Sequence, residues 1–225
     1  MKERVLTDER GFSLVEMLVT IIIMIVVLFA LYSIFDMSIK VFSFGNNKAE
    51  AMENARLGIE KMEREIRGAY KYDSSASQNH LFFTTASPTT ALTVPPTTVT
   101  QLTFGNDMGA PGAGNGIIEC GAPCEYITYK LTDDASNVAC TPANDPCTLR
   151  RVNTANSADW GDPVVENVAA GGLTFTLLQS NGATLATNEG DIGIVLVSLD
   201  IVVDQGTNTE GTQTLTTAID LRNRQ

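Results

Sequence analysis

The pattern of apolar and polar positions divides the chain into three regions. Residues 12–35 are almost uniformly apolar, and Glu16 is the only charged residue among them. At about 1.5 Å rise per residue, a helix of this length spans roughly 36 Å, which is enough to cross the apolar core of a bilayer. A carboxylate inside such a run is costly to bury, and Glu16 is therefore a candidate functional residue.

The second region has the period of an amphipathic helix and extends to about residue 72. Glu60 and Arg64, like Glu63 and Arg67, are spaced for ion pairs on the polar faces. Gly45-Asn46-Asn47 is a plausible weak point. Because the apolar stripe is short for a coiled coil, we expect it to pack on a sheet. The stripe consists of Met52, Ala55, Ile59, Met62, Ile66 and Tyr70.

The third region has a period of two, which indicates strands. These strands follow the helix and do not alternate with it, which predicts an α+β fold with a mainly antiparallel sheet. Ile194–Val197 is continuously apolar and predicts a central strand buried on both faces. Thr84–Thr100 and Gly105–Gly116 predict irregular loops. The expected strands are 81–83, 102–104, 126–131, 148–152, 164–168, 173–177, 192–203 and 215–221.

Four cysteines fall within a short window and suggest two disulfides, for which three connectivities exist. They are Cys120, Cys124, Cys140 and Cys147. If the hairpin of 126–131 and 148–152 pairs Leu131 with Thr148, Cys124 lies roughly 23 Å from the start of the second strand. A bridge reaches only about 7 Å between Cα atoms, so a Cys124–Cys147 bridge is excluded. We predict Cys120–Cys124 and Cys140–Cys147; a Cys124–Cys140 or Cys120–Cys147 bridge would contradict this. A zinc site is disfavoured because the second pair lacks the usual ligand spacing.

Composition limits the possible functions. The chain has 225 residues and a net charge of −11, which suits one soluble domain with a membrane segment and argues against a general nucleic-acid binder. Lys2, Arg4 and Arg10 precede the apolar run and favour a cytoplasmic N-terminal end. The rest of the chain should therefore lie outside the cytoplasm, where disulfides persist.

The stretch Arg10-Gly11-Phe12-Ser13-Leu14-Val15-Glu16-Met17-Leu18 resembles the processing site of type IV pilin-like precursors. The resemblance implies that a prepilin peptidase cuts between Gly11 and Phe12, and that the new amino group of Phe12 is then methylated. It also implies that Glu16 guides assembly by pairing with the Phe12 amine of a neighbouring subunit. The expected segments are a leader (1–11), a transmembrane and filament-core helix (12–35), an amphipathic helix (36–72) and an extracytoplasmic β-rich domain (73–225).

Two simpler interpretations of the apolar run compete with this one. A secretory signal peptide has an apolar core of about 7–15 residues and a cleavage site of small residues. Residues 12–35 are too long for such a core, and Ala30-Leu31-Tyr32 offers no such site. An ordinary membrane anchor explains the length but not the motif at its start. For Glu16 the simpler alternative is a carboxylate in contact with lipid headgroups or water.

The later part of the chain resembles PilW-type minor pilins and J-type pseudopilins. The resemblance lies in Tyr-Lys-Leu at 129–131, Cys-Thr-Leu-Arg-Arg at 147–151, Leu-Thr-Phe-Thr-Leu at 173–177 and the end of the chain from Thr216. Residues 12–35 lack the proline or glycine that is common in major pilins, and major pilins are usually shorter. Both departures favour a minor subunit.

The resemblance implies a structural subunit of a type IV pilus-like filament, in assembly priming or at the tip. Alternatives are a filament-displayed adhesin, a DNA-uptake subunit or a pseudopilin of type II secretion. The implied partners are other pilins, the prepilin peptidase, the inner-membrane assembly platform and, before assembly, the lipid bilayer. No direct nucleic-acid contact is expected.

The sequence offers no constellation of residues for catalysis, so we expect no enzyme, no metal and no cofactor. His80 is the only histidine and adjoins an expected strand. Asp133-Asp134, Asn144-Asp145 and Asn188–Asp191 carry oxygen ligands that calcium would accept. None of them has the spacing of an EF-hand, so we interpret them as solvated turns.

Overall fold

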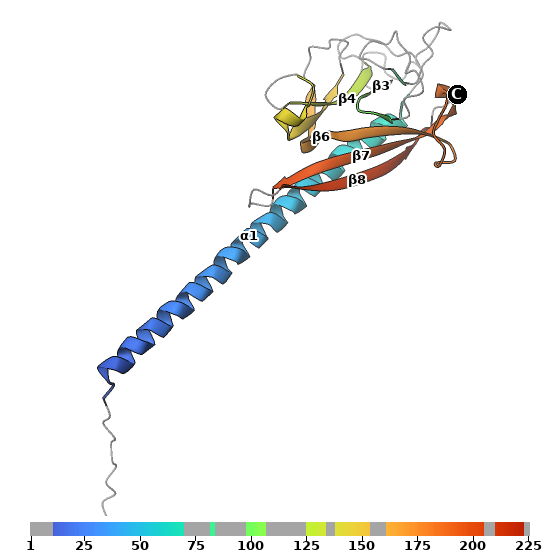
Figure 1. Ribbon diagram of the computed structural model, residues 1–225. Helices are drawn as coiled ribbons and strands as arrows, with labels where there is room; N and C mark the ends of the chain where they lie inside the picture. The colour runs from blue at the N-terminus through green and yellow to red at the C-terminus, as the bar shows by residue number, and fades with distance from the viewer. Residues whose placement is uncertain are drawn as a thin grey trace, which may run out of the picture. The chain divides into compact units, whose positions relative to one another are not determined.

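The structure is a computed structural model that describes residues 11–69, 82–83, 98–106, 125–133, 138–153, 161–204 and 210–222. It consists of two compact units, Met1–Asn46 and Asn47–Gln225. In the described residues, the first unit consists of an apolar part of one helix and the residues that precede it. The second unit holds the rest of that helix and an antiparallel sheet (Figure 1).

The helix, α1 (Leu14–Arg67), begins two residues after Phe12 and ends where Gly68 follows. It is helical through Gly45-Asn46-Asn47, so the expected weak point is not a break. A single helical glycine costs only about 1 kcal/mol relative to alanine, which a long helix tolerates. The boundary between the two compact units nevertheless falls after Asn46.

The amphipathic stripe packs inside the second unit, as expected. Ala55, Ile59, Met62 and Ile66 are buried, and Met52 is half-buried. Tyr70 lies outside the described residues. The stripe also buries two residues that the sequence analysis did not place on it, Gly58 and Glu65.

Within the residues that the structure describes, eight strands form one sheet in which all pairings between strands are antiparallel, which confirms the expected α+β, pilin-like fold. Seven strands follow the order β1-β3-β4-β5-β6-β7-β8, and β2 pairs with β6. The described parts of the connections include two short 3-10 helices, η1 (Pro142–Asn144) and η2 (Glu189–Asp191). The strands are β1 (Phe82–Phe83), β2 (Thr98–Val99), β3 (Leu102–Gly105), β4 (Tyr126–Thr132), β5 (Cys147–Val152), β6 (Asp162–Gln179), β7 (Ile192–Asp204) and β8 (Glu210–Asp220).

The sequence separates 164–168 from 173–177, whereas the structure joins them in the single strand β6. The register against β7 moves from Val168↔Ile201 to Leu173↔Leu199, so β6 contains a bulge. Gly171 has a φ of +76° within the bulge, a value that glycine adopts without strain. The bulge lets the first half of β6 pair with β5 and the second half with β2.

Two other expectations about the sheet were wrong in part. β7 lies between β6 and β8, but only one face of its Ile194–Val197 segment is buried. Val195 and Val197 are buried, while Ile194 and Leu196 are half-buried, because the other face of the sheet at this point is only partly covered. The loop expected over Thr84–Thr100 includes the two-residue strand β2.

The hairpin of β4 and β5 is confirmed with a shift of one residue. Leu131 pairs with Leu149, and Thr132 pairs with Thr148. The long connection between the strands is closed by the expected Cys140–Cys147 disulfide, whose Cα atoms lie 5.9 Å apart. Cys120 and Cys124 lie outside the described residues.

Candidate functional site

The N-terminal motif is accessible at the start of α1. Gly11, Phe12 and Ser13 precede the helix, and the amide of Met17 donates its hydrogen bond to the carbonyl of Ser13 at 3.1 Å. The side chain of Phe12 is 74% exposed, and no other part of the described chain comes within 4 Å of a Cβ placed on Gly11. The Gly11–Phe12 bond therefore lies in irregular, uncovered backbone, which suits a peptidase.

Glu16 lies in the first turn of α1 and is exposed. The amino-terminal end of a helix carries a partial positive charge, so a carboxylate is favourable there. Among the residues that the structure describes, no side-chain hydrogen bond or ion pair engages Glu16. Its carboxylate is thus available to a cation outside the described chain.

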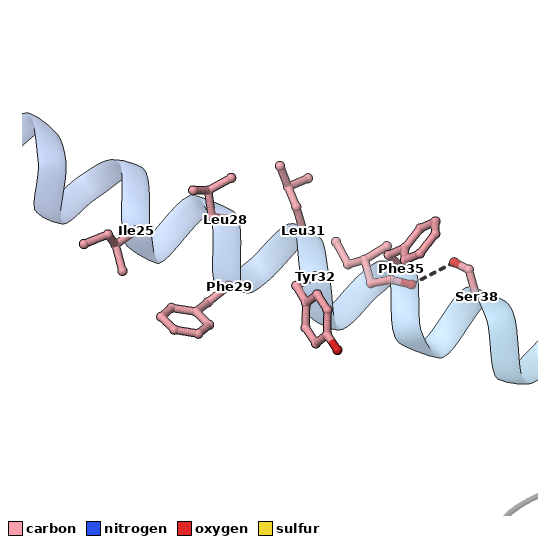
Figure 2. A pocket seen from close by; sticks show the side chains of 8 residues that line it. Ile25, Leu28, Phe29, Leu31, Tyr32, Phe35 and Ser38 are labelled. Atoms are coloured by element: carbon pink, nitrogen blue, oxygen red, sulfur yellow. Dashed lines mark hydrogen bonds between the residues drawn. The ribbon is translucent and has the colours of Figure 1, made fainter.

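The helix behind Glu16 presents apolar side chains on all sides. Large apolar residues from Phe12 to Phe42 are 47–83% exposed. An 18-residue window of α1 reaches a mean hydropathy of 3.0 with none of it buried, so the helix is long and apolar enough to cross a membrane. Figure 2 shows part of this surface, with Ile25, Leu28 and Phe29 projecting from the ribbon.

Two hydroxyl groups near the apolar surface, those of Thr20 and Ser38, are satisfied by the helix itself. Thr20 donates to the carbonyl of Met17 at 2.9 Å, and Ser38 donates to the carbonyl of Ile34 at 2.8 Å (Figure 2). Polar groups without water need internal partners, and these bonds supply them. The segment therefore suits an apolar environment such as a lipid bilayer or the packed core of an assembly.

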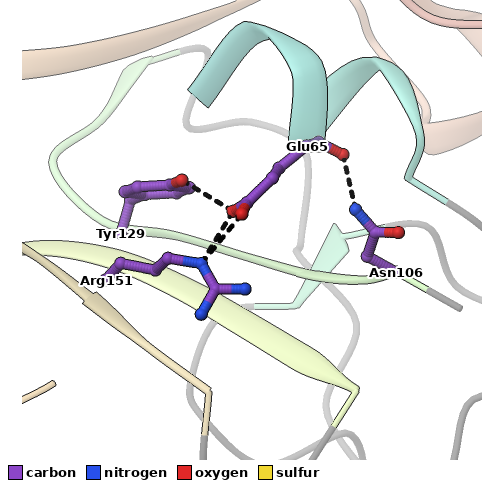
Figure 3. A network of polar contacts seen from close by, with 4 residues as sticks. All are labelled: Glu65, Asn106, Tyr129 and Arg151. Atoms are coloured by element: carbon purple, nitrogen blue, oxygen red, sulfur yellow. Dashed lines mark hydrogen bonds and ion pairs between the residues drawn. The ribbon is translucent and has the colours of Figure 1, made fainter. Parts of the chain in front are cut away.

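A second group of polar residues attaches α1 to the sheet within the second unit (Figure 3). Glu65 on α1 receives hydrogen bonds from Nε of Arg151 on β5, at 2.9 and 3.0 Å, and from the hydroxyl of Tyr129 on β4, at 2.7 Å. The side-chain amide of Asn106 donates to the backbone carbonyl of Glu65 at 3.0 Å. Glu65 and Arg151 expose only 11% and 16% of their side chains, so this network is largely shielded from water.

Burial and the adjacent carboxylate both act on Tyr129. Burial disfavours the charged phenolate, and the negative charge of Glu65 disfavours it further, so the pKa of Tyr129 is raised well above its usual value. Arg151 acts in the opposite direction but does not cancel these effects. Tyr129 therefore stays a hydrogen-bond donor to Glu65 across the ordinary pH range.

Gly58 allows α1 to approach the sheet closely. A Cβ at this position would lie 2.1 Å from Cγ2 of Val165 and 3.3 Å from Cγ1 of Val164, both on β6. Only glycine fits this approach without displacing a neighbour. Together with the Glu65 network, Gly58 fixes how the helix lies against the sheet.

The loop closed by the Cys140–Cys147 disulfide docks on the bulge of β6. Asp145 accepts a hydrogen bond from the amide of Ala170 at 2.8 Å, and Cys147 pairs with Val168. Cys147 is fully buried. The disulfide and the Asp145 contact thus hold the loop against the strand.

The remaining predicted residues divide into two groups. His80 and Asp134 lie outside the described residues. The expected turns at 144–145 and 188–191 are hydrogen-bonded, since Asn144 bonds to Thr141, and Asn188 donates to Asp191 at 3.2 Å. No group of three or more His, Cys, Asp or Glu side chains suited to a metal occurs in the described parts of the chain.

The sequence analysis missed Glu65, Tyr129, Arg151, Asn106 and Gly58. A signal was present for Glu65, because it lies three residues after Met62 and seven after Gly58, on the buried side of the helix. For Tyr129 and Arg151 there was none, since their partner lies 64 and 86 residues away in the sequence.

Comparison with known protein families finds a match at the N-terminal end of the chain. Residues 6–32 match the prokaryotic N-terminal methylation motif. This prepilin-type motif implies processing by a prepilin peptidase and assembly with pilins, which form a structural family. The chain has no significant match among curated proteins or among solved structures. It therefore combines a prepilin-type methylation motif with a pilin-like α+β fold.

Proposed function

We propose that the chain is a minor pilin or pseudopilin, a structural subunit of a type IV pilus-like filament that acts in assembly priming or at the tip. One observation carries the proposal. A methylation motif over residues 6–32 includes the start of α1, where the apolar side chains are uncovered on all sides and the first turn holds Glu16. A pseudopilus of type II secretion is the alternative setting for the same subunit.

Processing would occur between Gly11 and Phe12, which releases residues 1–11 as a leader. The new amino group of Phe12 carries a positive charge and is the site of methylation. Glu16 lies four residues further on and has no partner among the described residues. In an apolar core, the carboxylate of one subunit is stabilised by the amine of its neighbour, because an unpaired charge there is costly.

The segments would then take distinct places. Residues 12–35 lie in the inner membrane before assembly and in the filament core afterwards, where their uncovered apolar side chains pack against other subunits. Residues 36–72 connect this segment to the β-rich domain, residues 73–225, outside the cytoplasm. The assembly platform of the inner membrane would pass the subunit from one environment to the other.

The N-terminus of the mature chain tests the proposal. We expect N-terminal sequencing and mass spectrometry of the extracted protein to find a methylated Phe12 as the first residue. Gly11→Val should leave the precursor uncut, while the matched variant Ser13→Ala should be processed normally. A chain that begins at Met1 in cells with an active prepilin peptidase would overturn the proposal.

A further inference from the structure

The second unit carries a pocket at the carboxyl-terminal end of α1 that is lined by three arginines and two glutamates. This arginine pocket of about 550 Å³ is formed by the last turns of α1 and by Arg222 beyond β8. Arg67 is paired with Glu63. Arg64 and Arg222 are exposed, and no ion pair or side-chain hydrogen bond engages either of them within the described residues. The lining residues are Glu60, Glu63, Arg64, Arg67, Gly68 and Arg222.

The helix alone does not account for this cluster. Cations near the carboxyl-terminal end of a helix are favourable, which explains Arg64 and Arg67. Arg222 is not part of α1, and it brings a like charge into the pocket that Arg64 lines. Glu60 lines the same pocket, but within the described residues no ion pair joins it to Arg64 or Arg222. A carboxylate from outside can therefore still pair with both guanidinium groups.

An acidic pocket of about 370 Å³ lies nearer the start of the second unit. It is formed by α1, by Pro146 next to the disulfide, and by the ends of β6 and β7. Its charged groups are Glu50 and Glu166, both exposed, and neither is engaged in an ion pair within the described chain. The lining residues are Asn47, Glu50, Ala51, Asn54, Pro146, Glu166, Asn167, Val202 and Val203.

We propose that the acidic pocket of one copy of the chain docks on the arginine pocket of a second copy, head to tail. The proposal rests on the proposed function as a filament subunit. Glu50 and Arg64 are 14 residues apart on α1, which corresponds to roughly 21 Å along the helix, so they cannot pair within one copy. Between parallel copies displaced along the helix axis, Glu50 and Glu166 meet Arg64 and Arg222.

The geometry of such a contact fits a filament. Because the two surfaces differ, the contact is heterologous, and a heterologous contact between parallel copies extends in one direction without closing on itself. The contact places at least two copies next to one another, in a priming complex or in the filament. It is electrostatic and exposed, so it should weaken as salt is added.

Charge exchange in the full-length chain tests the contact. Two copies with different tags are produced together, and their co-isolation from detergent-extracted membranes is measured. We expect Arg64→Glu or Glu50→Arg alone to lower co-isolation roughly threefold or more, since each variant replaces attraction by repulsion. The double variant Arg64→Glu/Glu50→Arg should restore it, because the exchanged charges again attract.

The controls come from the same helix. Arg56 and Glu53 are exposed and line neither pocket, so Arg56→Glu and Glu53→Arg should leave co-isolation unchanged. An equal loss for Arg56→Glu and Arg64→Glu, or no recovery in the double variant, overturns the head-to-tail contact. The same samples are sequenced from the N-terminus. If the chain begins at Phe12 and Arg64→Glu leaves co-isolation unchanged, only the head-to-tail contact is rejected. If the chain is uncut, the proposed function is rejected.

Discussion

The carboxylate of Glu65 on α1 pairs with Nε of Arg151 on β5 at 2.9 Å, across 86 residues of sequence. The close approach at Gly58 and the apolar packing around it already limit how the helix lies on the sheet. The ion pair adds a directional constraint, because each largely buried charge depends on the other for the solvation it has lost. The pair and the packing together set the position of α1 on the sheet.

Removing one member of this pair should be costly. We expect Glu65→Gln to lower the free energy of unfolding by about 3 kcal/mol, because the buried guanidinium of Arg151 loses its counter-charge. Urea unfolding of the full-length chain in detergent, followed by near-UV circular dichroism, measures this. The control is Glu63→Gln, which breaks the half-exposed pair with Arg67 and should cost only about 0.5 kcal/mol. Equal losses for the two variants would show that Glu65 does not hold the helix.

Tyr129 should make the second unit sensitive to alkali. Its raised pKa means that the folded chain keeps the phenolic proton after the unfolded chain, with a pKa of about 10, has released it. The unfolded state then binds fewer protons, so the free energy of unfolding is unaffected below about pH 10 and falls as the pH rises beyond it.

The variant Tyr129→Phe isolates this contribution. At neutral pH it should lose about 1 kcal/mol with the hydrogen bond to Glu65. Between about pH 9 and about pH 12, a range that brackets the ordinary pKa of tyrosine, the free energy of unfolding of this variant should fall less steeply with pH than that of the parent chain. Identical alkaline slopes in urea unfolding at stepped pH would contradict the role given to Tyr129.

Gly58 should not tolerate even a methyl group. We expect Gly58→Ala to destabilise the chain by about 1–3 kcal/mol, because the new Cβ overlaps Val165 and the gain in helix propensity is smaller than this clash. Gly45→Ala is the matched control, since nothing lies within 4 Å of its Cβ, and it should be neutral or stabilising. Thermal unfolding compares the two, and Val165→Ala should recover part of the loss in Gly58→Ala.

The disulfide should stabilise the β4–β5 connection. Replacing both Cys140 and Cys147 by serine should cost about 2 kcal/mol, from the lost constraint on the unfolded chain. Urea unfolding of this variant and of the parent chain, each without reductant, gives the difference. Asp145→Ala, with the disulfide intact, should lose about 1 kcal/mol with the hydrogen bond to Ala170. A double-serine variant as stable as the parent would contradict this account.

Glu16 should matter to assembly and not to processing. We expect Glu16→Ala to be cut at Phe12 like the parent chain but to be at least tenfold depleted from sheared filaments, because in the proposed assembly contact the Phe12 amine of a neighbour would lose its counter-charge. The measurement is quantitative immunoblotting of filament and membrane fractions. Thr20→Ala, one turn further along α1, is the control and should be incorporated normally. If Glu16→Ala is incorporated into filaments as well as the parent chain, the proposed role of Glu16 in assembly is wrong.

Periodicity was enough to predict the elements whose surroundings are regular. The stripe at Ala55, Ile59 and Met62, the β4–β5 hairpin and the Cys140–Cys147 bridge follow from spacing alone, and the structure contains them. The split of β6 into two strands was wrong because Gly171-Gly172 resembles a turn in sequence, whereas in the structure it forms a bulge within a continuous strand.

The polar network needed tertiary information. A glutamate on a helix is normally solvated, and Glu65 stands among other charged residues. Its burial depends on Tyr129 and Arg151, which reach it only when β4 and β5 pair in the observed register. Likewise, Gly58 is necessary because Val165 on β6 lies close to it, and the local sequence around Gly58 does not predict that the two residues meet.

The separation between Glu65 and Arg151 has a consequence for biosynthesis. At about 5–20 residues per second, a ribosome adds the intervening 86 residues in roughly 4–17 s. Until Arg151 has been added, the carboxylate of Glu65 lacks this partner and the stripe of α1 lacks the complete sheet on which it packs. The apolar part of α1, which is long enough to cross a membrane, is made first and is therefore complete before the strands of the sheet exist.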